Sequence, residues 1–207
     1  LSKDYVFPVG TNSQRQTLTA YFNDLTTGSL LVNYYSVDPG SIGLPVSESG
    51  LTFTDQFPTG YWSALAKNSL ASISYNVNLD ASGFGPYIIN ANTRLLRRTN
   101  SGGSWDLLNG THAPALGNIV YRINLNGVSN AGGGTQFGLG WCGPKITTEP
   151  VTHSVCINDN TSFNIVASGG SGGLTYQWYK APGTLLTNDG HFGGTITNNL
   201  TISNSVV

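Results

Sequence analysis

Apolar residues occupy every second position in several short runs of this chain, and this spacing limits the fold more than any other feature of the sequence. The longest unbroken runs are Ile73, Tyr75, Val77, Leu79 and Ile119, Tyr121, Ile123, Leu125. Residues two apart point to the same face of a β-strand, so each run predicts a strand with one buried face. The segment nearest to a helical period, 62–70, is too short to fill three turns. The sequence therefore predicts an all-β protein.

Residues 1–141 form a series of expected strands with turn signals between them. Leu18, Ala20 and Phe22 share one face of a strand over 16–22. Asp38-Pro39-Gly40 is a strong turn signal, and the further expected strands cover 30–37, 51–54, 61–66, 87–90, 93–98, 105–108 and 136–141, with 93–98 and 105–108 joined as a hairpin. We interpret this segment as an N-terminal jelly-roll-like β-sandwich. Its two central strands are expected to contain Tyr75, Val77, Ile119, Tyr121 and Ile123.

The segment 146–207 follows a short expected linker, 142–145, and has the pattern of an immunoglobulin-like β-sandwich. Alternating apolar residues predict strands over 163–167 and 174–178, the second ending at Trp178, where such a sandwich places its buried tryptophan. The run Asn198–Ser203 predicts one more strand. A complete domain of this type needs roughly 100 residues. The sequence therefore predicts an incomplete immunoglobulin-like domain that lacks its last strands.

Charged residues are scarce, and this bounds the partners and the location of the protein. They make up 9% of the chain, against about 25% in typical soluble proteins. A polar but uncharged surface is typical of secreted β-proteins, so we expect an extracellular or cell-surface location. The net charge of -1 offers no basic footprint for nucleic acid or for an anionic membrane. No apolar run is long enough for a membrane span. The chain starts with Leu1 and has no Met, which predicts a mature or excised segment of a longer precursor.

Several motifs along the chain carry a resemblance to a known class of proteins. In the second part they are Pro150-Val151, Val155-Cys156, Phe163–Gly169, Leu174–Trp178 and Leu200–Asn204. In the first part they are Phe7–Gly10, Ala91–Arg98 with Trp105, Asn124–Ser129 and Phe137–Gly140. The second set resembles the immunoglobulin-like repeats of giant Bacteroidota surface proteins, and the first is similar to a module that often precedes those repeats. The resemblance implies export by the type IX route and a role as a surface adhesin or filament component. The Tyr-x-Cys strand and the closing strand of the family are missing here.

No recognisable constellation of catalytic residues accompanies these motifs. Asp55, Asp80 and Asp106 lie near the ends of expected strands, where two carboxylates facing each other across a cleft would suit glycoside hydrolysis. Structural roles in turns are the favoured interpretation for all three. Metal-ligand spacing is missing among the three histidines, His112, His153 and His191. We therefore expect no enzyme activity and no cofactor.

Two loops and two cysteines are considered as a calcium site and as a disulfide. Asn158-Asp159-Asn160 and Asn188-Asp189-Gly190 offer oxygen ligands without the ligand count of a calcium loop. Cys142 and Cys156 could close a short loop as a disulfide, which would stabilise the chain by about 3 kcal/mol. Alternatively the two do not meet, and Cys156 pairs with a cysteine beyond Val207.

The candidate ligand surface is the basic cluster of the chain together with a tryptophan. Arg94 and Arg98 share one face of an expected strand while Arg97 points to the other, so at least one is expected to pair with a carboxylate or to pack over an aromatic ring. The sharper alternative is that Arg94, Arg98 and Trp105 bind an anionic glycan. Exposed aromatic residues would also suit a carbohydrate-binding module, although core packing is favoured for each of them.

The incomplete second sandwich predicts a subunit contact. A groove around Phe163 and Trp178 would leave backbone groups unpaired, and such an edge invites an added strand. The N-terminal segment that alternates Tyr5, Phe7 and Val9 is the expected donor from another copy, which would generate a filament. Further domains of the same polypeptide are the other partner considered. The leading hypothesis is a non-catalytic structural or adhesive protein, and the alternative is a carbohydrate-binding module of a secreted polysaccharide-degrading enzyme.

Overall fold

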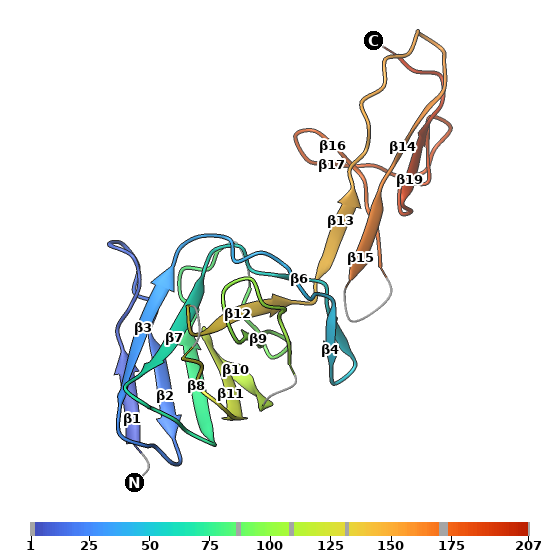
Figure 1. The fold of residues 1–207 in the computed structure, drawn as a ribbon. Helices are drawn as coiled ribbons and strands as arrows, with labels where there is room; N and C mark the ends of the chain where they lie inside the picture. The colour runs from blue at the N-terminus through green and yellow to red at the C-terminus, as the bar shows by residue number, and fades with distance from the viewer. Residues whose placement is uncertain (1–2, 86–87, 108–109, 131–132, 170–173, 207) are drawn as a thin grey trace. The chain divides into compact units, whose positions relative to one another are not determined.

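The computed structural model describes residues 3–85, 88–107, 110–130, 133–169 and 174–206. These residues form β-strands, turns and irregular segments, and none of them is helical. Consequently none of the described segments is a helix that could cross a membrane. The chain divides into two compact units, Leu1–Cys142 and Gly143–Val207. The expected all-β fold is confirmed, and each unit is described by itself (Figure 1).

The first unit contains two principal antiparallel sheets. The first sheet has the order β1-β2-β8-β11-β10. Its strands are β1 (Lys3–Phe7), β2 (Leu18–Phe22), β8 (Tyr75–Asp80), β10 (Thr111–Leu116) and β11 (Ile119–Leu125). The second sheet has the order β3-β7-β12-β6, with β9 also paired to β12. Its strands are β3 (Ser29–Tyr35), β6 (Asp55–Gln56), β7 (Tyr61–Lys67), β9 (Arg94–Arg98) and β12 (Thr135–Trp141).

The chain crosses repeatedly from one sheet to the other, as in a jelly roll. It does so from β2 to β3, from β7 to β8, from β8 to β9, from β9 to β10 and from β11 to β12. A separate hairpin, β4 (Val46–Glu48) and β5 (Leu51–Phe53), follows β3. Its two-residue turn has both Ser49 and Gly50 at positive φ, the conformation that matches the twist of paired strands.

The core of the first unit lies between the two sheets. Leu18, Ala20 and Phe22 are buried on one face of β2, as the alternation predicts. Trp62 on β7 is fully buried, stacks on Phe84, and donates its indole N–H to the Gln16 carbonyl at 2.8 Å. The largest aromatic side chain of the core is therefore fixed by both packing and a hydrogen bond.

The two longest alternating runs are both strands, but only one buries the predicted face. In β8, Tyr75, Val77 and Leu79 are buried, whereas Ile73 lies outside the strand and is exposed. In β11 the faces are reversed: Val120 and Arg122 are buried, while Ile119, Tyr121 and Ile123 are only half-buried. A register shift between Arg122 and Leu125, with Asn124 at positive φ, returns Leu125 to the core.

Other predicted elements have mixed outcomes. The hairpin that joins 93–98 to 105–108 is present, since Arg97 and Asp106 form an antiparallel bridge. The strand expected over 87–90 is wrong for its described residues, 88–90, and Tyr87 lies outside the described residues. Residue 108 also lies outside them. The linker expected over 142–145 is partly a strand, because β13 begins at Pro144.

The second unit consists of short antiparallel ladders. Its strands are β13 (Pro144–Thr148), β14 (Thr161–Asn164), β15 (Val166–Gly169), β16 (Tyr179–Lys180), β17 (Thr184–Leu185), β18 (Phe192–Gly193) and β19 (Asn199–Ile202). They pair as β13-β15, β14-β19-β18 and β16-β17. The strand expected over 163–167 is divided at Ile165, because β14 and β15 pair with different partners.

The expected strand 174–178 is not a strand, and Trp178 is half-buried instead of fully buried. The Trp178 backbone N–H donates to the Thr195 carbonyl, and its carbonyl accepts the Leu186 N–H. Its indole N–H donates to the Thr197 carbonyl at 2.9 Å. The buried apolar residues among those described in this unit are Leu186 and Leu200. The second unit thus has a small core and short strands.

We predict that Tyr75 makes the first unit sensitive to alkali. Burial raises the pKa of Tyr75 to about 12, and its hydroxyl donates to the Gly127 carbonyl at 3.2 Å. The folded protein holds this proton more tightly than the unfolded chain, so the resulting stability is complete below pH 10 and is lost as the pH rises toward 12. The free energy of unfolding should fall by roughly 2–3 kcal/mol over this window, measured by urea unfolding monitored through tryptophan fluorescence.

The matched comparison uses Tyr75→Phe and, as control, Tyr179→Phe at an exposed position of the second unit. The pH dependence of the first unit should flatten in Tyr75→Phe and should persist in Tyr179→Phe. An unchanged slope in Tyr75→Phe would contradict the prediction.

Candidate functional site

The residues expected to form a ligand surface lie inside the first unit. Arg94 and Arg98 are about 96% buried, and Trp105 is almost fully buried. The Arg98 guanidinium carbon lies 4.2 Å from the centroid of the Trp105 ring, and its Nε donates to Gln136 Oε1 at 2.7 Å. Burial lowers the pKa of Arg98. The glycan-binding interpretation of these residues is therefore wrong, because they stabilise the interior. The expected packing of an arginine over an aromatic ring is confirmed.

Two arginines from different sheets share one carboxylate. Glu48 on β4 accepts hydrogen bonds from Arg94 Nε at 2.9 Å and from Arg122 Nη2 at 3.0 Å. Arg122 is fully buried and also donates to the carbonyls of Leu107 and Gly110. The β4–β5 hairpin is therefore joined electrostatically to β9 and to β11. The sequence analysis did not single out Glu48 or Arg122. The usable signal was Arg122 itself, because a charged residue within an apolar strand is unusual in a chain with so few charges.

His112 lies beside this cluster. One ring nitrogen, Nε2, is 3.1 Å from the Ala91 carbonyl, which also accepts a hydrogen bond from Arg94. Burial and the charge of Arg94 lower the pKa of His112. The imidazole is thus favoured in its neutral form, and its position next to Arg94 and Glu48 adds to the polar interior of the unit.

Arg97 points to the opposite face of β9, as predicted, and is buried there; neither of the salt bridges between described residues includes it. Its Nη2 is 3.4 Å from the Gly127 carbonyl, while Nε and Nη1 have no hydrogen-bond partner among the described residues. Unsatisfied buried donors cost about 1–3 kcal/mol each.

The aspartates considered for catalysis occupy separate structural positions. Asp55 lies on the short strand β6 and accepts the Gln56 N–H, Asp80 ends β8 and accepts the Ser82 N–H, and Asp106 pairs with Arg97 through the backbone. Each therefore has the turn or strand-end role that the sequence favoured.

The oxygen-rich loops use their side chains to hold the backbone. Asp159 accepts the Cys156 N–H and Asn160 accepts the Asn204 N–H. Asp189 Oδ1 accepts the N–H groups of His191 and Phe192, which lower its pKa. Within the described ranges, no group of three or more potential ligands from His, Cys, Asp and Glu gathers around a metal position.

Both cysteines are free thiols in the structure. They belong to different units, so the Cys142–Cys156 disulfide that the sequence left open stays a prediction. Cys142 packs against the smaller hydrophobic cluster of the first unit, which contains Phe53, Leu96 and Trp105. Cys156 is exposed in a turn of the second unit. Each cysteine thus belongs to a different unit.

The N-terminal segment is already paired within its own unit. β1 forms an antiparallel ladder with β2, and Tyr5, Phe7 and Val9 pack against the core of the first unit. β1 is thus the end strand of its own sheet, and the expected donation of this segment to another copy stays a prediction. Of the expected acceptor residues, Phe163 and Trp178 are half-buried within the second unit, so the groove around them is partly filled.

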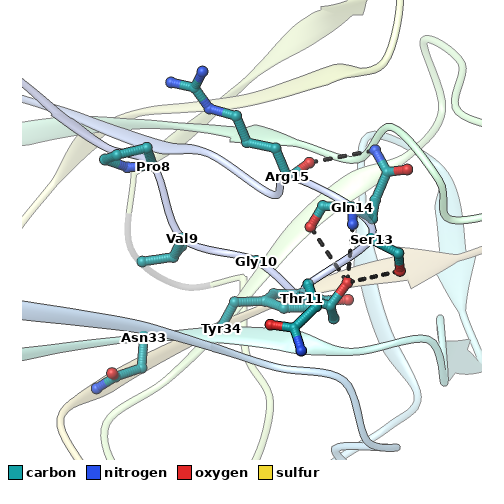
Figure 2. A pocket seen from close by; sticks show the side chains of 10 residues that line it. Pro8, Val9, Gly10, Thr11, Ser13, Gln14, Arg15, Asn33 and Tyr34 are labelled. Carbon is teal, nitrogen blue, oxygen red and sulfur yellow. Dashed lines mark hydrogen bonds between the residues drawn. The ribbon is translucent and has the colours of Figure 1, made fainter.

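An open groove lies beside the loop that follows β1, and the sequence analysis did not identify it. It has a volume of about 550 Å³ and is lined by Pro8–Arg15 together with Asn33 and Tyr34 of β3. Figure 2 shows the loop on one side and the two β3 residues on the other. The unbroken polar run Thr11–Thr17, which precedes the apolar alternation that begins at Leu18, was the signal in the sequence.

The loop of this groove is held by its own hydrogen bonds. Thr11 N–H donates to the Gln14 carbonyl at 2.8 Å, and Gln14 N–H donates to Thr11 Oγ1 at 3.0 Å. Gln16, which follows the loop, donates its backbone N–H to the Val9 carbonyl. Its own carbonyl accepts the indole N–H of the buried Trp62. The groove therefore has a preformed wall that is tied to the core.

Comparison of the chain with known protein families, curated proteins and solved structures finds no match.

We predict that Glu48 is required for the stability of the first unit. Glu48→Gln keeps the size of the side chain and leaves the buried guanidinium groups of Arg94 and Arg122 without their shared counter-charge. Removing one partner of a buried ion pair costs about 3–5 kcal/mol. Chemical denaturation at pH 7 should show a loss of this order, while Glu149→Gln at an exposed position should be neutral. Equal stabilities of the two variants would contradict the prediction.

Proposed function

We propose that this chain is a non-catalytic structural and adhesive protein of the cell exterior, which works as part of a surface adhesin or filament built from β-sandwich units. The scarcity of charge and the resemblance to surface-protein repeats support the location. The engagement of the charged interior residues in internal ion pairs and hydrogen bonds supports a structural role for them.

The observation that carries the proposal is the apolar surface of the second unit. Its exposed large apolar residues are Ile146, Val151, Val155, Ile157, Val166, Tyr179, Leu185, Ile196 and Val206. Only two described apolar residues of the unit are buried. Contiguous exposed apolar surface marks sites of association, and we infer that a partner covers exposed apolar residues of this unit.

The ladder of β13 and β15 is the favoured place for that partner. It has two strands among the described residues, so both of its outer edges are unpaired there. Ile146 on β13 and Val166 on β15 are 45% and 46% exposed. In the first unit, β1 is the end strand of its sheet and carries the exposed Val6. We infer that the β1 edge of one copy pairs with the β13–β15 ladder of another, which is a head-to-tail contact that extends into a filament.

We predict that the chain associates with itself and that a charge on the ladder weakens this association. Val166→Lys places an ammonium group at the proposed edge, a device that blocks edge pairing in natural sheets. Sedimentation velocity over a range of concentrations should show association of the wild type and at least about tenfold weaker association of Val166→Lys. Ile196→Lys introduces the same charge at an exposed site outside the two strands of the ladder and should associate normally. A wild type that stays monomeric at high concentration would refute the proposal.

The second candidate function is a carbohydrate-binding module of a secreted polysaccharide-degrading enzyme. The polar groove of Figure 2 favours it, because amide and hydroxyl groups line a preformed hollow of a size suited to a small ligand. Retention on a panel of insoluble polysaccharides distinguishes the two: a module of this kind is retained as a monomer, whereas a purely structural subunit is not retained.

A further inference from the structure

The core of the first unit is open at the side where both of its sheets end. β1 is the end strand of one sheet and β3 is the end strand of the other (Figure 1). A hollow of about 200 Å³ lies between them. None of the described residues that line it is charged, and the apolar side chains of the lining are Tyr5, Phe7, Phe22, Leu25, Leu30 and Leu70.

The lining belongs to the inward faces of the two strands. Tyr5 and Phe7 pair in register with buried residues of β2, whereas Val6 between them is 57% exposed. Leu30 of β3 packs against the same core. The Tyr5 ring meets the buried Phe22 ring edge-on, with centroids 5.9 Å apart. The hollow is therefore an unfilled position in the apolar layer between the sheets.

The hollow lies beside an unpaired strand edge. β1 pairs with β2 on one side, and no other described strand pairs with it. Neighbouring strands lie about 4.8 Å apart, so a strand added at this edge would continue the sheet past β1 and over the hollow. Every second side chain of the added strand would face inward, as Tyr5 and Phe7 do. The occupant that satisfies both features is an extended strand with an apolar residue on its inward face, because a small molecule would leave the backbone edge unpaired.

The size of the hollow limits what that inward residue can be. An apolar cavity of about 150 Å³ is large enough to hold benzene. The hollow of about 200 Å³ thus accepts one aliphatic or aromatic side chain.

The second unit contains a strand with these properties. β15 has the sequence Val-Ala-Ser-Gly, without charge and without proline. Its partner β13 contains Lys145 and also Pro144, which has no N–H to donate to a new ladder. In β15, Val166 is 46% exposed while Ala167 is half-buried, so the face that carries Val166 is the one open to a partner.

We propose that β15 of one copy pairs with the β1 edge of another, and that its Val166 side chain fills the hollow between β1 and β3. Both the lining and β15 are uncharged, so this contact buries no unpaired charge. The inference rests on the self-association proposed above and names the side chain and the hollow that anchor it.

The test changes the hollow and measures association of the full chain by sedimentation velocity. Leu25 lines the hollow and is 36% exposed. Leu25→Trp fills the hollow with a larger side chain, and Leu25→Asp adds a carboxylate that docking of Val166 would bury. Both variants should associate at least about tenfold more weakly than the wild type. Leu116→Trp and Leu116→Asp make the same changes at an exposed residue of β10, the other end strand of the β1 sheet, and should associate normally.

A mixture of two variants tests the direction of the contact. Val166→Lys keeps an intact hollow, and Leu25→Trp keeps an intact β15. Each should associate weakly alone, whereas an equimolar mixture should form a dimer that contains one chain of each. That dimer should not extend, because its remaining hollow and its remaining β15 are both blocked.

Thermal melts should show that all variants remain folded. Equal association of the Leu25 variants and their Leu116 counterparts, or a mixture that stays monomeric, would overturn the inference. If the Leu25 variants associate normally while Val166→Lys does not, the proposed assembly stands and only the hollow is removed as its anchor. A monomeric wild type refutes the assembly itself and the inference with it.

Discussion

The first unit depends on the burial of both faces of β9. One face meets the core between the sheets through Leu95, and the other meets the smaller cluster through Leu96. β9 also carries Arg94, Arg97 and Arg98. Covering both of its faces therefore buries three guanidinium groups in the protein interior. An isolated buried charge is too costly to keep, so each needs nearby acceptors. Glu48, Gln136 and backbone carbonyls provide them for Arg94 and Arg98, and the β4–β5 hairpin is placed where it can do so.

The sequence predicted the parts of the fold that depend on local alternation. β2 and β8 bury the predicted faces because their neighbours in the sheet are equally regular. β11 has more apolar residues than positions that face the core. The alternation alone therefore does not predict that Arg122 occupies one of the core-facing positions. That choice depends on Glu48, which is 74 residues away in the chain. The same long-range pairing turned the expected ligand surface of Arg94, Arg98 and Trp105 into a packed interior.

The sequence analysis did not locate the candidate groove, for a related reason. Its wall is a loop whose conformation is fixed by hydrogen bonds between Thr11 and Gln14, and its floor comes from β3. No residue in it has a catalytic or metal-binding signature. In the second unit, periodicity located the strands near 163–167 and 198–203, but it did not predict the change of partner at Ile165.

That change of partner determines how the strand ladders of the second unit bear tension along the chain. β14 and β15 lie end to end in the chain, and the Ile165 N–H donates to Asn198, which keeps the junction between them tied to the β19 side. Tension that enters from the first unit reaches β13 at Pro144, opposite Gly169, and tension on the distal side reaches β19 at Ile202, opposite Thr161. The two pulls act at opposite ends of the 161–169 segment and run along the strands. Antiparallel hydrogen bonds lie across that direction, so both ladders are loaded in shear, with several bonds sharing the force instead of opening one after another.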